Sequence, residues 1–230
     1  MFKYETHLHT APVSRCARAS VRENLEFYKR LGYDGIFITN HFAKGNINID
    51  TEMSYEEKLD FFFSDYKEAL RLSEKIGIRV FLGIEISFRG CDFLIYGLEP
   101  EWYYAHPEVL TLSASALLTL CREEGALVVH AHPFREASYI DHIQLYPRHV
   151  DAVEIYNACR TDFENEMAKQ YAENYAIAPF MGSDNHAAGK RPKLGGVEFD
   201  TPITSESDFV SRVKAGEAVL FRMENPCPEE

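Results

Sequence analysis

The chain has 230 residues, of which 46% are hydrophobic and 26% are charged, a composition that is ordinary for a soluble globular protein. Its formal net charge of −12 argues against binding of nucleic acid in bulk, because proteins with that role are normally basic. The charge leaves open a small phosphorylated substrate held by bound metal ions, and no apolar stretch is long enough to span a membrane.

The start of the chain and its cysteines predict a cytoplasmic protein. Met1 to Glu5 leads directly into a strand, which leaves no room for a signal peptide. The five cysteines are odd in number and widely spaced, and none forms a Cys-x-x-Cys pair. Such a set favours free thiols in a reducing compartment over a disulfide framework.

The first half of the chain alternates between strand-like apolar runs and capped helices. Ser20 and Ser54 each stand three residues before a glutamate, which is the capping-box pattern that opens a helix. We predict strands at residues 4–6, 35–39, 79–86 and 92–96, and helices at residues 20–31 and 54–76.

The second half continues the alternation. We predict a loop at residues 100–107, helices at 113–125 and 162–174, strands at 127–129, 151–156 and 177–181, a polar basic loop at 189–196, and a last strand, helix and strand that end near residue 221. No linker or low-complexity segment interrupts this order. The pattern predicts an α/β fold of parallel βα units in one domain, residues 1–223, with a frayed tail at 224–230.

His7 and His9 give the first indication of a functional site. Residues i and i+2 of a strand project from the same side, so these two imidazoles point at one place. Imidazole is a common ligand of zinc, iron and related metals. Because a His-x-His pair also occurs by chance, other residues of the chain are needed to indicate whether this pair binds metal.

The same chemistry returns at five further strand ends. In a barrel of parallel strands, such positions share the C-terminal rim, where enzymes of this architecture build their sites. Chance would scatter these residue types over helices and loops as well. The residues concerned are His7, His9, His41, Glu85, His132, Glu154, Asp184 and His186.

The ligand types favour a catalytic metal cluster. Histidines with carboxylates fit zinc, manganese or iron, and they do not fit a structural zinc site of four thiolates. About seven ligands are too many for one ion. A carboxylate can bridge two metals, and a pair of metals about 3.5–4 Å apart can activate a water. The sequence therefore predicts two to three divalent ions.

Five motifs resemble those of the polymerase and histidinol phosphatase (PHP) superfamily. They occur in the family's order over roughly residues 4 to 200. The resemblance implies a distorted, TIM-like (β/α)7 barrel with up to three divalent metals at the C-terminal rim, and hydrolysis of phosphate esters. The motifs are His7-Leu8-His9-Thr10, residues 34–41, Gly83-Ile84-Glu85, Ala131-His132-Pro133 and residues 182–186.

The resemblance also implies how the ligands divide among the ions. It makes Asp184 and His186 our candidates for the catalytic relay of a proton to the leaving oxygen, and the choice between them stays open. The implied sets are His7, His9, Glu85 and Asp184 for one ion, His41 and His186 for a second, and Glu85 with His132 for a third.

Four residues are possible additional ligands or partners of ligands. Many members of the family have a histidine or aspartate several residues after His-x-His, where the obvious ligand type here is Cys16. Asp92 stands where the family often has another histidine. His130 would face the opposite side of its strand from the site and is better explained as a buried histidine. Glu154 is open between orienting a metal-bound imidazole and a structural role.

Arg135 and Arg160 are the best candidates for binding a phosphate. Arginine recognises phosphate through two parallel hydrogen bonds. These two arginines are the closest in sequence to the predicted site residues.

We therefore expect a cytoplasmic, metal-dependent phosphoesterase, similar to histidinol phosphatase, that acts on a small phosphorylated substrate. One alternative is a nuclease or phosphodiesterase that acts on nucleotide or nucleic-acid ends. Another is an amidohydrolase-like C–N hydrolase. A lysine after the fourth strand would favour this function, and the sequence has none there. A barrel that only senses metal would require broken ligand motifs. The substrate, the metal and the oligomeric state stay open.

Overall fold

The computed structural model describes residues 1–42, 44–50 and 52–226. Within these ranges, nine strands join in one sheet in the order β7-β6-β5-β4-β3-β2-β1-β8-β9. The strands are β1 (Phe2–Glu5), β2 (Gly35–Ile38), β3 (Arg79–Phe88), β4 (Cys91–Tyr96), β5 (Leu127–Ala131), β6 (Ala152–Asn157), β7 (Ala178–Gly182), β8 (Lys193–Phe199) and β9 (Val219–Glu224). The helices are α1 (Val21–Arg30), α2 (Tyr55–Phe62), α3 (Ser64–Ile76), α4 (Pro100–Ala105), α5 (Ala114–Glu123), α6 (Asp162–Tyr175) and α7 (Glu206–Lys214), with 3-10 turns η1 (Pro107–Leu110) and η2 (Ala188–Lys190).

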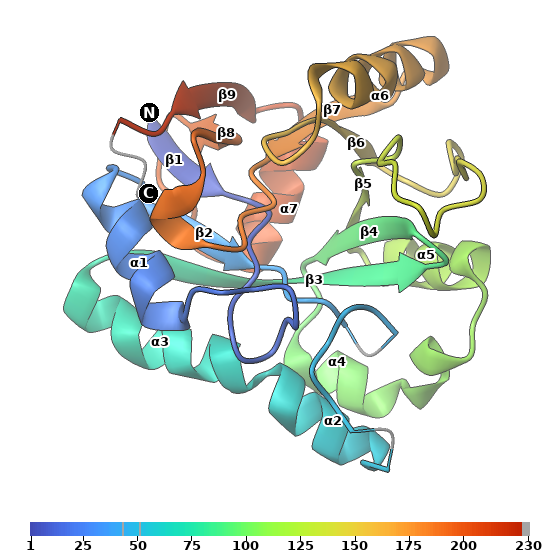
Figure 1. The fold of residues 1–230 in the computed structure, drawn as a ribbon, viewed down its shortest axis with the longest axis horizontal. Helices are drawn as coiled ribbons and strands as arrows, with labels where there is room; N and C mark the ends of the chain where they lie inside the picture. The colour runs from blue at the N-terminus through green and yellow to red at the C-terminus, as the bar shows by residue number, and fades with distance from the viewer. Residues whose placement is uncertain (43, 51, 227–230) are drawn as a thin grey trace.

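The sheet curls until its two halves meet and form a nearly closed barrel (Figure 1). Beyond β7, the hydroxyl of Ser183 accepts from the amide of Gly195 in β8 at 2.9 Å and donates to its carbonyl at 3.1 Å. The amide of His9 donates to the carbonyl of Asn185 at 2.9 Å. These contacts bring the segments after β1 and β7 side by side, and they confirm the predicted α/β barrel.

The nine strands agree in number with the nine expected from the apolar runs and exceed the seven of the barrel that the resemblance implies, whereas the expectation of purely parallel βα units is wrong. Strands β4 and β8 run against the other seven. The first reversal is a hairpin between β3 and β4, whose turn residues Arg89 and Gly90 have φ values of 51° and 86°. Two successive positive φ values are typical of the tight turns that join antiparallel strands.

Helix boundaries differ from the predictions at two places. The predicted helix at 54–76 is broken at Phe63 into α2 and α3. The predicted loop at 100–107 contains α4 and the first residue of η1. Pro100 and Pro107 each begin a helical turn, a position where the fixed φ of proline is favourable.

The C-terminal part of the chain is more regular than we predicted. β8 begins at Lys193, inside the predicted loop at 189–196, and β9 continues to Glu224. The side chain of Asn225 is buried and donates to the carbonyls of Gly189 and Arg191 at 2.7 and 3.0 Å. Residues 227–230 of the predicted tail lie outside the described residues.

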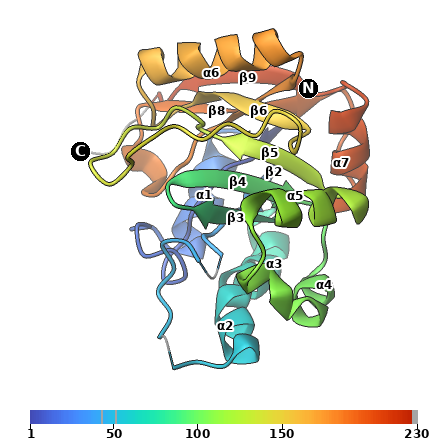
Figure 2. The same cartoon turned by 90° about the vertical axis from the view of Figure 1, so that its right-hand side faces the viewer.

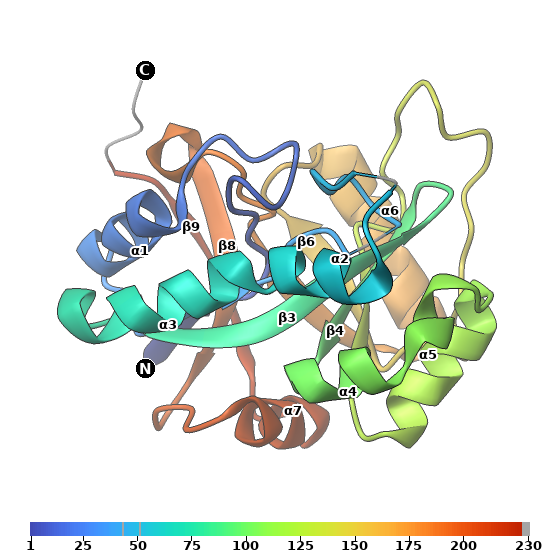
Figure 3. The same ribbon diagram turned by 90° about the horizontal axis from the view of Figure 1, so that it is seen from below.

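The interior of the barrel is filled with aromatic side chains, and α7 covers one of its ends. The ring of Phe209 in α7 lies 4.2 Å from that of Phe37 and 5.3 Å from that of Tyr96. Figure 2 shows α7 at the end of the barrel away from the loops that follow β1, β2 and β5, and Figure 3 shows α3 lying along β3 on the outside. With one end plugged, polar side chains can gather at the other.

Gly182 allows the close packing on which the open end depends. A Cβ atom at this position would lie 2.6 Å from Cβ of His7 and 2.7 Å from Oε1 of Glu154, which is closer than real Cβ contacts. Only glycine therefore lets β7 lie this close to the segment after β1, two residues before Asp184.

Among the described residues, no helix combines the length and apolar character that crossing a membrane requires.

Candidate metal centre

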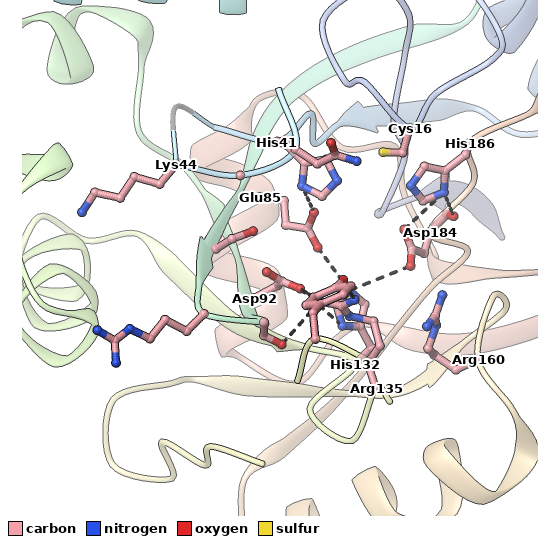
Figure 4. Close-up of a pocket in the computed structure, with 16 residues that line it drawn as sticks. Cys16, His41, Lys44, Glu85, Asp92, His132, Arg135, Arg160, Asp184 and His186 are labelled. Carbon is pink, nitrogen blue, oxygen red and sulfur yellow. Dashed lines mark hydrogen bonds and ion pairs between the residues drawn. The ribbon is translucent and has the colours of Figure 1, made fainter. Parts of the chain in front are cut away.

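The side chains predicted as metal ligands converge at the open end of the barrel. They lie at a cavity of about 570 Å³ whose lining includes His41, Glu85, His132, Asp184 and His186 (Figure 4). His7 and His9 are completely buried beneath it. Six of the seven predicted ligands follow the ends of β1, β2, β5 and β7, and Glu85 lies within β3, three residues before its end.

Glu85 lies at the middle of the cluster and is 1% exposed. Its Oε1 is 3.3 Å from Nε2 of His7 and 3.2 Å from Nε2 of His132. Its Oε2 is 2.6 Å from Nδ1 of His41 and 3.5 Å from Nε2 of His9. One carboxylate thus faces four imidazoles, which is the arrangement that a bridging ligand needs.

Asp184 faces the same cluster from the β7 side. Its Oδ1 is 3.4 Å from Nε2 of His9, 3.5 Å from Nε2 of His7 and 3.6 Å from Nδ1 of His186. Its Oδ2 is 3.9 Å from Nε2 of His132. Asp184 and His132 have φ values of 54° and 28°, so both residues hold their side chains in place with a backbone conformation that L-residues rarely adopt.

The donor atoms fall into three overlapping groups. Within each group, one donor atom of every member lies within 4.8 Å of one donor atom of every other member. His7 and His9 each belong to two of the groups and share one of them, so any ions that the groups hold would be close together. They are His7, His9 and Asp184; His7, Glu85 and His132; and His9, Cys16, His41 and His186.

Two observations show that these residues fit metal ions. Nδ1 of His41 and Oε2 of Glu85 are buried and 2.6 Å apart, yet neither makes an aligned hydrogen bond. A buried donor and acceptor without an aligned hydrogen bond need a further partner, which a bound cation would supply. Most of the other separations are 3.2 to 3.6 Å, close to the spacing of about 3.4 Å between donors at about 2.1 Å from a tetrahedral ion.

The electrostatics of the cluster favour cations. Burial opposes a charge on His7, but the carboxylates of Glu154 and Asp184 outweigh it and raise the pKa of His7 well above its usual value. Glu85 raises the pKa of His41 in the same way. Protons on imidazole therefore balance the carboxylates in this structure, and metal ions would replace them.

The pKa values of His9 and His186 are shifted in opposite directions by their surroundings. Burial, together with the charges of His41 and His186, lowers the pKa of His9 to about 3. Burial also opposes a charge on His186, but Asp184 raises its pKa to about 10. The neutral His9 is already in the form that binds metal.

Glu154 is a partner of ligands. Its side chain is completely buried. Its Oε1 accepts from Nδ1 of His7 at 2.9 Å, and its Oε2 accepts from the amide of His132 at 3.0 Å and from Nδ2 of Asn157 at 2.9 Å. Asn157 also donates to Oδ2 of Asp184 at 3.2 Å. Sequence reasoning missed Asn157, although it ends the same strand as Glu154 and could have been found by the strand-end criterion.

A second polar network holds the loop after His9. Nδ1 of His9 is 3.2 Å from the hydroxyl of Ser14, which donates to Oδ1 of Asn40 at 2.8 Å. Asn40 also accepts from the amide of Thr10 at 2.7 Å and donates to Oδ2 of the buried Asp65. Sequence reasoning missed Asp65, because nothing in the pattern of α3 separates it from a surface carboxylate.

The remaining possible ligands divide into two kinds. Cys16 lines the cavity and belongs to one of the three groups of donor atoms. Asp92 and His130 belong to none of them. Oδ2 of Asp92 accepts from Nη2 of Arg135 at 2.9 Å and lies 3.9 Å from Nδ1 of His132. His130 faces the core, where its ring stacks on Phe93 at 4.8 Å, because alternation along β5 turns it away from the rim.

Arg135 and Arg160 both line the cavity. Each has a buried Nε atom without a hydrogen-bond partner. Nη2 of Arg135 donates to Asp92, and its Nη1 donates to the hydroxyl of Tyr139. Lys44 and Arg89 lie on the same lining, so the mouth of the cavity carries positive charge in a strongly acidic protein.

Comparison with known families adds to this geometry. A family model described as PHP-associated (PHP_C) matches residues 162–218. A sequence search among curated proteins found no match.

Three solved structures share the fold. One is a two-domain protein from Bacteroides vulgatus that contains a predicted PHP-like metal-dependent phosphoesterase. Its TM-score is 0.67 and its identity is 15% over 96% of this chain. The present chain spans 64% of that protein's length. A candidate metal-dependent phosphoesterase from Bifidobacterium adolescentis has a TM-score of 0.56 and 15% identity, covering 95% of this chain and 97% of that one. An amidohydrolase from Chromobacterium violaceum has a TM-score of 0.55 and 13% identity, covering 94% and 97% respectively.

Proposed function

We propose that the chain is a PHP-type metal-dependent phosphoesterase that acts on a small phosphorylated substrate, a proposal supported by the PHP-associated family model over residues 162–218 and by the fold shared with two PHP-like structures. The observation that carries the proposal is the position of Glu85. Its two oxygens face four imidazoles at 2.6 to 3.5 Å, next to a cavity lined with arginines. A cluster of cations beside positively charged side chains suits a phosphoryl group, whose oxygens carry negative charge.

The ligands divide among two to three ions of zinc, manganese or iron. Bound there, the ions would lower the pKa of a water and neutralise charge on the phosphoryl oxygens. The sets that the resemblance implies are His7, His9, Glu85 and Asp184 for the first ion, His41 and His186 for the second, and Glu85 with His132 for the third. The donor groups in the structure overlap with these sets, and they add His7 to Glu85 and His132, and His9 and Cys16 to His41 and His186.

Asp184 and His186 are the candidates for moving the proton to the leaving oxygen. Nδ1 of His186 donates to the carbonyl of Asp184 at 2.7 Å, which leaves Nε2 for an ion or for a proton. The side chain of Asp184 lies 3.6 Å from the same Nδ1. The two residues are therefore linked, because the carbonyl of Asp184 fixes the proton of His186 on Nδ1 and sets the orientation of the ring.

Arg135 and Arg160 would hold the phosphate that is to be cleaved. Asp92 and Tyr139 each bind one terminal nitrogen of Arg135, so its guanidinium is held against the cavity wall. A fixed guanidinium loses little freedom when it binds an anion. Arg160, whose Nε lacks a partner, would approach the same anion from the side of β6.

The second candidate function is hydrolysis of a C–N bond. The Chromobacterium violaceum structure named an amidohydrolase shares this fold, and a metal-activated water can attack an acyl carbon as well as phosphorus. The arginine-lined cavity favours phosphoester hydrolysis because an amide carries no anion at the reacting atom.

A substrate panel distinguishes the two candidates. The protein would be stripped of metal, reloaded with zinc, manganese or iron, and incubated with phosphate monoesters, phosphodiesters and N-acyl compounds. We expect phosphate release from monoesters in the loaded protein and none in the stripped protein. Cleavage of N-acyl compounds without phosphate release from any ester would overturn the proposal.

A further inference from the structure

Cys16 lies among imidazoles at the cavity. Figure 4 shows it between His41 and His186, with its sulfur toward the cavity. One donor atom of each of these three residues and of His9 lies within 4.8 Å of the others. Three imidazoles and one thiol at these separations form a donor set of the kind that holds a tetrahedral ion.

The loop that carries Cys16 is fixed on both sides of it. Before Cys16, the hydroxyl of Ser14 accepts from the amide of His41 at 3.1 Å, and the amide of Arg15 donates to the carbonyl of Asn46 at 2.8 Å. After Cys16, the amide of Arg18 donates to the carbonyl of His186 at 2.7 Å. The residues on either side of Cys16 are thus hydrogen-bonded to the backbone of the same two histidines that its side chain faces.

The other described thiols have different surroundings. Cys91 and Cys121 are packed in the hydrophobic core. Cys159 donates its thiol to the carbonyl of Asp184 at 2.9 Å, so it already has a partner. Cys16 is the thiol, among the described cysteines, that belongs to a group of metal-binding donors.

We infer that the thiolate of Cys16 is a ligand of the second metal position, where it completes the set with His41 and His186. On binding, the sulfur–metal bond replaces the S–H bond, and the proton leaves to solvent. Thiolate is a soft ligand, so this position should select zinc, cobalt(II) or iron over manganese and magnesium. The inference rests on the proposed function only in requiring that the centre binds metal.

Cobalt(II) makes the ligand visible without an activity assay. A thiolate bound to cobalt gives a charge-transfer band in the near ultraviolet, which imidazole and carboxylate do not. The band would be followed while the metal-free protein, Cys16→Ser, Cys16→His and the matched control Cys159→Ser are titrated with cobalt. We expect the band in the unmodified protein and in Cys159→Ser, and its loss in both Cys16 variants.

Bound metal, counted in the same samples, gives an independent result. Cys16→Ser should bind about one equivalent less than the unmodified protein, and Cys16→His should recover that equivalent without the band, because histidine supplies a nitrogen at the same place. A band that persists in Cys16→Ser, or disappears in Cys159→Ser, would overturn the assignment.

Zinc X-ray absorption of the unmodified protein keeps the test independent of variants that do not fold. We expect one sulfur at about 2.3 Å among nitrogen and oxygen ligands at about 2.0–2.2 Å. Bound zinc without a sulfur neighbour contradicts this inference alone. A protein that binds neither zinc nor cobalt contradicts the metal-dependent function itself, and the inference with it.

Discussion

Replacement of Glu154 by glutamine should weaken metal binding although Glu154 touches no ion. Its two oxygens accept from three donors, namely Nδ1 of His7, the amide of His132 and Nδ2 of Asn157. Glutamine has one acceptor oxygen. If that oxygen faces His7, the amide nitrogen meets two donors, and if it faces His132 and Asn157, the donor on His7 is unpaired.

The size of the effect follows from this count. Each hydrogen bond to a buried charged group is worth about 1.5–3 kcal/mol, and at least one is lost. Partners of metal-bound histidines typically change metal affinity by about 10–100-fold when they are mutated. We therefore expect Glu154→Gln to raise the zinc dissociation constant of the tightest site by about 10–100-fold, measured by competition with a chromophoric chelator at constant pH.

Asp151→Asn is the matched control. Asp151 precedes the same strand at its other end, where it accepts from the amide of Val128 and from Nε of Arg122, both at 2.9 Å. Its replacement removes a carboxylate with similar partners far from the cluster, and it should leave zinc affinity unchanged. An affinity of Glu154→Gln within about threefold of the parent, a difference well below 1 kcal/mol, would refute the orienting role of Glu154.

Three further outcomes test the centre. Asp184→Ala should abolish turnover and reduce bound metal while circular dichroism stays unchanged, because Asp184 supplies an oxygen and little core volume; full metal content with normal turnover would exclude it from the site. Arg135→Ala should lower kcat/KM about a hundredfold at unchanged metal content, and Arg135→Lys should recover only part; a change within about threefold would mean that Arg135 does not hold the phosphate. Metal uptake should release protons, because His7, His41 and His186 have pKa values raised above the usual imidazole value, to about 10 for His186, and must lose those protons to bind metal. Affinity should therefore rise as the pH increases through neutrality, and calorimetry in buffers of different ionisation enthalpy would show it; uptake without proton release would contradict the charge states described here.

The metal ligands at strand ends could be predicted from the sequence, whereas the directions of two strands could not. A strand end that carries a histidine or carboxylate can be read from the sequence, and a barrel brings such ends together wherever they occur. That is why His41 and Asp184 were found although 143 positions of the numbering separate them. The direction of β4 and β8 could not be predicted in this way, because a buried apolar run has the same pattern in a parallel and an antiparallel strand.

Side-chain contacts between distant segments could not be predicted from the sequence either. Arg135 was expected to bind phosphate because it is close in sequence to the predicted site residues, and it does line the cavity. Its partner Asp92 comes from β4, and nothing in the local pattern of either residue indicates the pair. Asn40 directly precedes His41, and its amide serves as both acceptor and donor between Thr10 and Asp65, which a carboxylate cannot do.

The positive φ values of His132 and Asp184 make this centre vulnerable to selection for stability alone. A left-handed conformation costs an ordinary L-residue about 1–2 kcal/mol, and glycine at either position would remove that steric cost. A library of this chain sorted only for heat resistance should therefore enrich glycine at both positions and lose these two ligands.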